Sequence, residues 1–208
     1  MSKIDLNDLS KMQYDVLSEL GNIGAGNATT ALATMVNRKI DIGVPHVRLV
    51  EFDQISTIIG PEEDVKVGIL IMLHGDVKGM MMFLLDDNIA KNLINILMGR
   101  PDGSEVLFDD LERSVVMEIG NIIAGAYLNS LSAMTGLNIE VSVPLLDIDM
   151  AGAILSVPAI EFGKIGDKVL LIETEFDGEV DKAYAINGYY ILVPELESYE
   201  KILGSLGV

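Results

Sequence analysis

Two short stretches of the chain place acidic and amide side chains at the spacing of one helix face. The residues are, in the first copy and then in the second, Asp15, Glu19, Asn22, Ser114, Glu118 and Asn121. At 100° per residue, the three positions of each copy stand at about 0°, 40° and 340° around a helix. An asparagine is no useful general base, but its amide accepts and donates hydrogen bonds and can hold a water molecule in line with a phosphorus atom. The stripe therefore suits phosphoryl transfer, where positioning and electrostatics supply most of the catalysis.

A solvated helix face is the alternative interpretation of such a stripe, and for a single copy it would be the better one. Both the glutamate and the asparagine recur in register, however, while most neighbouring surface positions differ between the copies. We therefore favour a functional stripe.

The stripes belong to an internal repeat. When residues 15–45 are aligned without gaps on residues 114–144, 12 of 31 positions are identical, including Pro45 with Pro144. Two copies are too few for a solenoid. We predict a single domain over residues 1–208, built from two repeats at about 8–99 and about 107–208 and related by a pseudo-two-fold axis. The linker is residues 99–105.

Each repeat predicts a long helix, a hairpin and a closing helix. The hairpins turn at Gly75–Asp76 and at Asp177–Gly178, with a further bend at Asn187–Gly188. The closing helices begin near residue 86 and at Pro194, which suits a first helical position. We expect an α/β (α+β) fold with long helices packed on a mostly antiparallel sheet formed by both halves. In the second strand of the first hairpin, alternation predicts that at least one residue of 80–82, all methionine, faces outward.

The repeated segments at residues 18–27 and 117–126 are rich in glycine, like a phosphate-binding loop. The spacing of the glycines is wrong for such a loop, however, and the preceding residues predict helix. Glycine inside a helix is about 1 kcal/mol less favourable than alanine. The repeated glycines, Gly21 with Gly120 and Gly26 with Gly125, are therefore expected to allow close approach of another backbone.

Composition excludes several classes of function. The chain has no cysteine, which removes disulfides, thiolate metal sites and cysteine nucleophiles and fits a reducing cytoplasm. A net charge of −18 argues against nucleic acid or an anionic membrane as partner. No signal peptide is recognisable, and the apolar run at residues 67–73 is far shorter than the roughly 18 residues of a membrane span. His46 and His74 have no companions at metal-ligand spacing, so we predict no metal site.

The repeated pattern resembles the signature of the CheC/CheX/FliY family of bacterial chemotaxis phosphatases. That signature is Asp or Ser, three residues, Glu, two residues, Asn, then twenty-two residues and Pro, and both copies here match it. Two copies in a chain of about 200 residues are most similar to the CheC branch of that family.

The resemblance implies hydrolysis of the aspartyl phosphate of the response regulator CheY. Asn22 and Asn121 would orient water, while Glu19 and Glu118 would contact the lysine beside the phosphorylation site of CheY. The protein would need no cofactor of its own, because the magnesium would belong to CheY. The resemblance also implies binding of the receptor deamidase CheD. Asp15 and Ser114 hold the looser first position of the signature.

Pro45 and Pro144 are expected to be structural, at the entry to the following strand. A non-catalytic alternative stays open for the chain as a whole. It is a binding or scaffold module of the chemotaxis or flagellar-switch system that holds CheY or CheD without turnover.

Overall fold

The computed structural model describes residues 6, 8–37, 40–42, 46–51, 54–162, 168–178 and 186–208. The helices are α1 (Lys11–Val36), α2 (Ile55–Ile59), α3 (Asp87–Leu97), α4 (Asp110–Thr135), α5 (Ala151–Phe162) and α6 (Leu196–Ser205). The strands are β1 (Ile40–Ile42), β2 (His46–Glu51), β3 (Val65–Gly75), β4 (Gly79–Asp86), β5 (Ile139–Val141), β6 (Leu145–Met150), β7 (Lys168–Gly178) and β8 (Ile186–Pro194).

The elements of the first half recur in the second half in the same order. Helices α1 and α4 both contain 26 residues, and their first residues, 11 and 110, are 99 positions apart. Strands β1 and β5 start at the same separation, as do β2 and β6. In each half a helix, a hairpin and a closing helix then follow.

The sheet exchanges strands between the two halves. In the described part of the chain it has eight strands, in the order β1-β7-β8-β4-β3-β5, with β2 also on β7 and β6 also on β3. Every ladder is antiparallel. The first two strands of each half thus pair with the hairpin of the other half, and β4 meets β8 in the centre. The prediction of an antiparallel sheet formed by both halves is confirmed.

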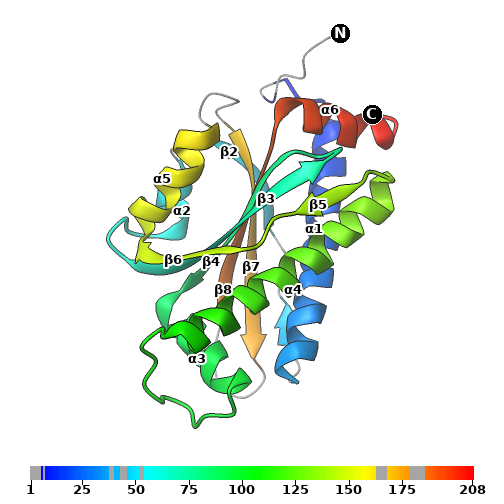
Figure 1. Cartoon of the computed structure of the whole chain (residues 1–208). Coiled ribbons are helices and arrows are strands. Elements are labelled where there is room, and N and C mark those ends of the chain that lie inside the picture. The colour runs from blue at the N-terminus through cyan, green and yellow to red at the C-terminus, as the bar shows by residue number, and fades with distance from the viewer. Residues whose placement is uncertain are drawn as a thin grey trace.

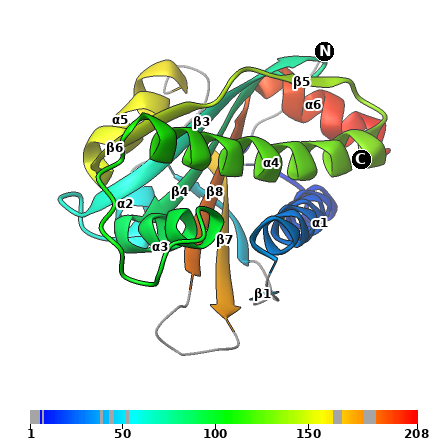
Figure 2. The ribbon, with the colours of Figure 1, turned by 60° about the horizontal axis from the view of Figure 1, so that its bottom comes forward.

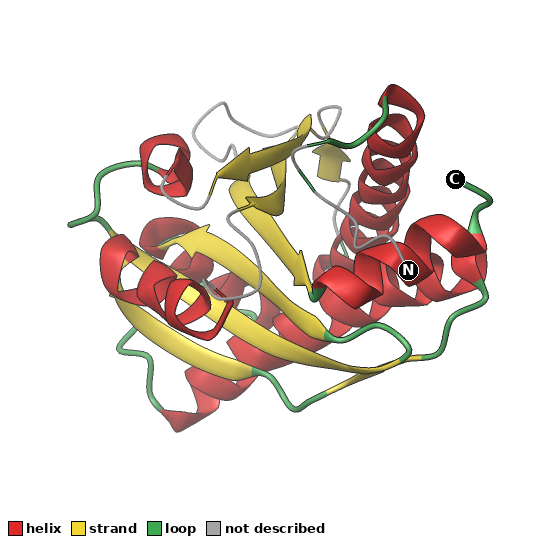
Figure 3. Cartoon of the chain, turned by 90° about the horizontal axis from the view of Figure 1, so that it is seen from above, coloured by secondary structure: helices red, strands yellow, loops and turns green. Residues whose placement is uncertain are grey.

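Helices cover both faces of this sheet (Figures 1 and 3). Side chains from α1, α3, α4 and α6 form one apolar cluster with the sheet, and side chains from α2 and α5 form a second on the opposite face. Met81 packs in the first cluster, whereas Met80 and Met82 pack in the second, and none of the three is more than 2% exposed. The expectation that one of them faces outward is therefore wrong.

The two long helices cross one another on the same face of the sheet (Figure 2). Their contact depends on a glycine, because a Cβ at Gly24 would lie 2.4 Å from Cε2 of Tyr127. The Tyr127 ring is fully buried, and it also stacks on Tyr190 of β8. The Tyr127 ring of α4 thus occupies the space that the missing side chain of Gly24 leaves on α1.

Three boundaries differ from the sequence-based prediction. Asp177 and Gly178, predicted as a hairpin turn, lie in β7 and pair with β1. Pro194 ends β8, where it pairs with Gly79, and Glu195 is the N-cap of α6. The predicted bend at Asn187–Gly188 is instead strand, paired with Glu175 and Thr174 of β7. The hairpin turn at Gly75–Asp76 is confirmed, since β3 ends at Gly75 and β4 begins at Gly79. Helices α2 and α5 were not among the predicted elements.

Candidate functional site

Each long helix begins at a capping box, which fixes the phase of the stripe that follows. In α1, the Gln13 backbone N–H donates to Oγ of Ser10 at 3.2 Å, and the Ser10 N–H donates to the Gln13 side chain at 2.9 Å. Asp109 and Glu112 exchange the equivalent bonds in α4, at 2.9 and 3.1 Å. Such boxes satisfy two of the free N–H groups at a helix start. Each stripe then begins five residues after its cap.

The first turn of each long helix is also hydrogen-bonded to a strand of the same half, α1 to β2 and α4 to β6. The Tyr14 hydroxyl donates to the carbonyl oxygen of Val47 in β2 at 3.2 Å. Arg113, at the equivalent position of α4, donates from Nη2 to the carbonyl oxygen of Leu146 in β6 at 3.4 Å. Different side chains therefore make the same helix-to-strand link in the two halves.

Gly21 and Gly120 let the helices lie close to the sheet. A Cβ at Gly21 would lie 2.7 Å from Cγ2 of Val47, and a Cβ at Gly120 would lie 2.4 Å from Cγ2 of Ile69. The prediction of close packing at these two glycines is confirmed, although the neighbours are side chains and not backbone. For Gly26 and Gly125 it is wrong, because no described atom lies within 4 Å of a Cβ built there.

The second copy of the stripe lines an open depression of about 460 Å³. Its residues are Ser114, Met117, Glu118, Asn121, Val141, Ser142, Val143 and Pro144. Ser114, Glu118 and Asn121 are exposed on one face of α4, and Pro144 is buried immediately before β6. The structure thus brings together the four second-copy residues of the signature. The Ser114 hydroxyl donates to the Asp110 carbonyl oxygen at 2.7 Å, within its own helix.

The wall opposite α4 is held rigidly to the sheet. Ser142 and Met72 of β3 exchange two hydrogen bonds of 3.0 Å, one from the Ser142 N–H to the Met72 carbonyl oxygen and one from the Met72 N–H to the Ser142 hydroxyl. Val143, beside them, is 80% exposed. The polar face of α4 therefore lies opposite an apolar rim at Val143.

The first copy differs from the second at its asparagine. Asp15 and Glu19 are exposed on α1, but Asn22 is half-buried. Its Oδ1 atom is buried and has no hydrogen-bond donor among the described residues. Pro45 lies outside the described residues, so the fourth member of this copy is not placed.

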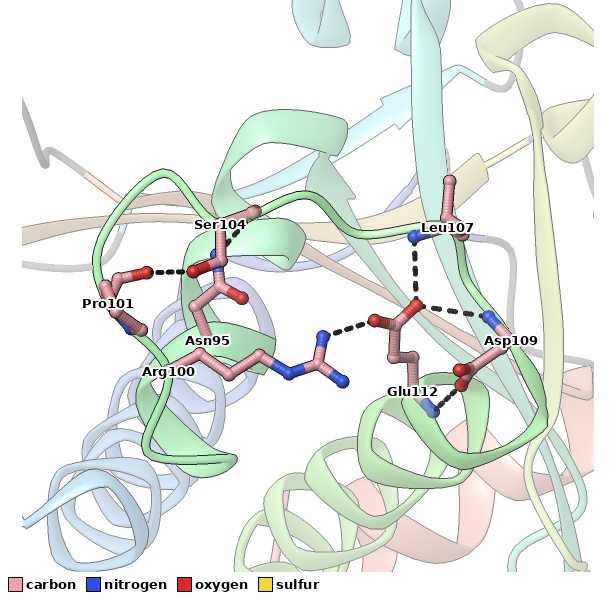
Figure 4. A network of polar contacts seen from close by, with 7 residues as sticks. All are labelled: Asn95, Arg100, Pro101, Ser104, Leu107, Asp109 and Glu112. Carbon is pink, nitrogen blue, oxygen red and sulfur yellow. Dashed lines mark hydrogen bonds and ion pairs between the residues drawn. The ribbon is translucent and has the colours of Figure 1, made fainter.

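A polar network fixes the linker against the start of α4 (Figure 4). Arg100 forms an ion pair with Glu112, whose other oxygen accepts the Leu107 N–H at 3.0 Å. The Asn95 side chain donates to the Ser104 carbonyl oxygen at 3.0 Å. Glu112 is only 3% exposed and stands two residues before Ser114. The hydrogen bond from Arg100 holds the pKa of Glu112 below its ordinary value.

No group of three or more histidine, aspartate or glutamate side chains in the described ranges is arranged to hold a metal ion. His46 and His74 are both exposed, on β2 and β3. Of the helices that the structure describes, none is long and apolar enough to cross a bilayer.

Two features of this face were missed by the sequence analysis. Residues 141–143 complete the depression beside the second stripe. The internal repeat contained a signal for them, because Val44 and Val143 are identical at the same offset as the two prolines. The other feature is a groove of about 810 Å³ between the C-terminal halves of α1 and α4. Its wall includes the equivalent pairs Asn27 and Ala126, Thr30 and Asn129, Ala31 and Ser130, and Thr34 and Ala133. The sequence of either helix alone does not predict a groove, because the groove forms only where the two helices cross.

Known proteins match both the sequence and the fold. The sequence pattern of the CheC-like family matches residues 12–48 and 111–146, which contain both stripes. The CheY-P phosphatase CheC of Bacillus subtilis is 33% identical over 204 residues, covering 97% of each chain. In fold, the chain resembles FliY of Thermotoga maritima, with a TM-score of 0.73 and 23% identity over 95% of this chain and 97% of that one.

A third match is CheX in the CheX-CheY-BeF3-Mg+2 complex of Borrelia burgdorferi, with a TM-score of 0.54 and 19% identity. It covers 83% of this chain and 96% of that one. Identity at this level supports the fold alone, whereas the full-length match to the Bacillus protein establishes kinship. The chain belongs to the CheC-like family.

Proposed function

We propose that this chain is a phosphatase that hydrolyses the aspartyl phosphate of phosphorylated CheY. The observation that carries the proposal is the exposed acid and amide pair on α4, set in an open depression whose two serines, Ser114 and Ser142, both donate to main-chain carbonyl oxygens. The full-length relative in Bacillus subtilis, which bears the name CheY-P phosphatase, supports the same substrate.

In the proposed reaction, Asn121 and Asn22 enter the phosphorylation site of CheY and orient a water molecule. The water oxygen attacks phosphorus as the bond from phosphorus to the aspartate oxygen breaks. The electron pair of that bond returns to the carboxylate, and the water proton leaves with inorganic phosphate. Orientation of this kind lowers a barrier without any change of covalent state in the protein.

Glu118 and Glu19 have a positioning role in this proposal. Each is exposed and stands almost one turn before its asparagine along the same helix face. A carboxylate there would form an ion pair with the lysine beside the phosphorylated aspartate of CheY and so hold the asparagine in register. The magnesium ion, which belongs to CheY in this scheme, would neutralise charge on the phosphoryl oxygens. The chain itself needs no cofactor.

The decisive test replaces both asparagines with alanine. We expect Asn22→Ala with Asn121→Ala to reduce phosphate release from phosphorylated CheY by at least about 100-fold, because loss of orientation alone has effects of that size. Asn92→Ala on α3 is the matched control, since it removes a partly exposed helical asparagine away from both stripes. A double variant that is folded by circular dichroism and as fast as the control would rule the proposal out.

Non-catalytic binding is the rival function, and the strongly acidic composition with no conventional catalytic set favours it. Substoichiometric assays separate the two. A phosphatase converts many molecules of phosphorylated CheY per chain, whereas a binding module changes the lifetime of phosphorylated CheY only in proportion to the complex formed.

We further propose that the chain binds the receptor deamidase CheD, as its membership of the CheC-like family supports. Purified CheD should co-elute with the chain in size-exclusion chromatography and should increase the rate of phosphate release. Separate elution at micromolar concentrations would contradict this.

The recurrence of elements supports one domain of two repeats, at about residues 8–99 and 107–208. Because each half completes its sheet with strands of the other, neither half should fold alone. Expression of residues 1–103 should therefore yield an unfolded product, and a cooperative unfolding transition of this fragment would contradict the single-domain proposal.

A further inference from the structure

One glycine of each stripe has no evident role within the chain. Gly125 follows Asn121 by four residues and Gly26 follows Asn22 by four, about 40° around the same helix face. Both lie inside helices of 26 residues. Glycine there disfavours the helix by roughly fivefold in equilibrium constant relative to alanine, so its presence in both copies calls for a reason.

Packing within the chain does not supply that reason. The other repeated glycines, Gly21 and Gly120, would clash with side chains of the sheet if they carried a Cβ. At Gly26 and Gly125, by contrast, no described atom beyond the adjacent residues and the helix's own backbone lies within 4 Å of the added carbon. An alanine would fit at either position.

Backbone conformation does not supply it either. The described glycines with positive φ are at positions 60, 75, 79, 99, 103, 136 and 207, so neither Gly26 nor Gly125 is among them. Both have ordinary helical geometry, which alanine adopts more readily.

The same stripe carries an exposed apolar residue at its other end. Leu111 stands three residues before Ser114 and is 61% exposed, and Met12 stands three residues before Asp15 and is 64% exposed. Each stripe thus runs from an apolar side chain through the acid and the amide to a partly exposed glycine. A small ligand would not need a surface of this length, whereas a folded protein partner would cover it.

We infer that Gly125 and Gly26 are clearance positions, which means that they leave room for phosphorylated CheY to approach the backbone of α4 and α1. The partner's surface packs directly against the partly exposed helix backbone at these residues, and this sets how deeply Asn121 and Asn22 reach into its phosphorylation site. Glycine allows such an approach because it has no Cβ. The inference rests on the proposed function and deepens it. Gly125 and Gly26 are positioning residues, and they do not contact the reacting atoms.

Affinity provides the first test, with CheY carrying beryllofluoride and Mg²⁺ as the probe. The double variant Gly26→Ala with Gly125→Ala should bind this probe at least about tenfold more weakly than the unaltered chain, because two buried contacts are displaced. It should also melt at a higher temperature, since both helices gain a better helix former. Unchanged affinity would overturn the inference, as would failure of the unaltered chain to bind the probe.

Gly204→Ala is the matched control. Gly204 lies in α6, has no described atom within 4 Å of a built Cβ and has no positive φ. The control should raise the melting temperature in the same way and leave the affinity unchanged. An equal loss of affinity in Gly204→Ala would show that helix stiffening, and not clearance, is the cause, and would also overturn the inference.

Kinetics provide a second readout that separates this inference from the proposed function. In a parent with Asn22→Ala, where only the second copy can turn over, Gly125→Ala should raise KM about tenfold with a smaller change in kcat, and Gly125→Leu should raise it further. If the parent hydrolyses phosphorylated CheY but both Gly125 variants keep its KM, the clearance role is wrong and the phosphatase proposal stands. If the unaltered chain binds the probe through these glycines without any hydrolysis, the phosphatase proposal alone is wrong.

Discussion

The two stripes share their sequence signature but not their surroundings. On α4, Asn121 is exposed beside a wall that two hydrogen bonds join to β3. On α1, Asn22 is half-buried, and its Oδ1 atom has no donor among the described residues. The cap of α4 is charged and joined to the linker through Arg100, whereas the cap of α1 is neutral. A duplicated motif therefore retains its helical phase while its environment diverges.

The largest expected effect concerns the relative activity of the two copies. Asn121→Ala should reduce phosphate release from CheY by at least about tenfold, while Asn22→Ala should reduce it less than threefold, because an amide with a buried oxygen is less available to water. Single-turnover assays with each variant measure this directly. Equal losses would show that the difference in burial has no catalytic consequence.

The next effect concerns the two packing glycines. Gly120→Ala should lower the free energy of unfolding by about 1–3 kcal/mol, because the new carbon meets Ile69, which is fully buried in the sheet. Gly21→Ala should be tolerated better, since Val47 is only partly buried on the edge strand β2 and has room to move. Urea titrations of the two variants give the comparison. A larger loss for Gly21→Ala would contradict the difference in packing.

The charged cap should give a smaller, pH-dependent effect. Glu112→Gln removes the ion pair with Arg100 and should lower the melting temperature at neutral pH. The pKa of Glu112 is lowered in the folded state, so its contribution is complete above the ordinary value of 4.5 and is lost as pH falls through the depressed pKa. The gap in melting temperature between this variant and the unaltered chain should therefore narrow below about pH 4.5. A gap that widened in acid would mean that the ionised carboxylate is not the stabilising form.

The smallest effect should come from the link between helix and strand. Tyr14→Phe removes one exposed hydrogen bond to β2 and should lower the free energy of unfolding by no more than about 1 kcal/mol. Activity of the second copy, isolated by Asn22→Ala, should not change. A marked loss of that activity would show that the first turn of α1 supports both copies together.

Local signals in the sequence predicted much of this fold. Helical periodicity placed the long helices, and Gly75–Asp76 placed a hairpin turn, because both depend on residues near in sequence. The helix start predicted at Pro194 is wrong, since proline is tolerated at the end of a strand as well as at the start of a helix. Helix α5 was missed because it is apolar on most sides and contains Pro158, so no helical period stands out.

The sequence by itself determined which side chains share a helix face, because the angle between them follows from 3.6 residues per turn. It also revealed the duplication and the glycines that recur with it. Only the tertiary structure decided which half each edge strand joins, since strand pairing acts between distant residues and both hairpins offer similar apolar ladders. That exchange places Ser142 against Met72 of β3 and so sets the wall of the depression beside Asn121.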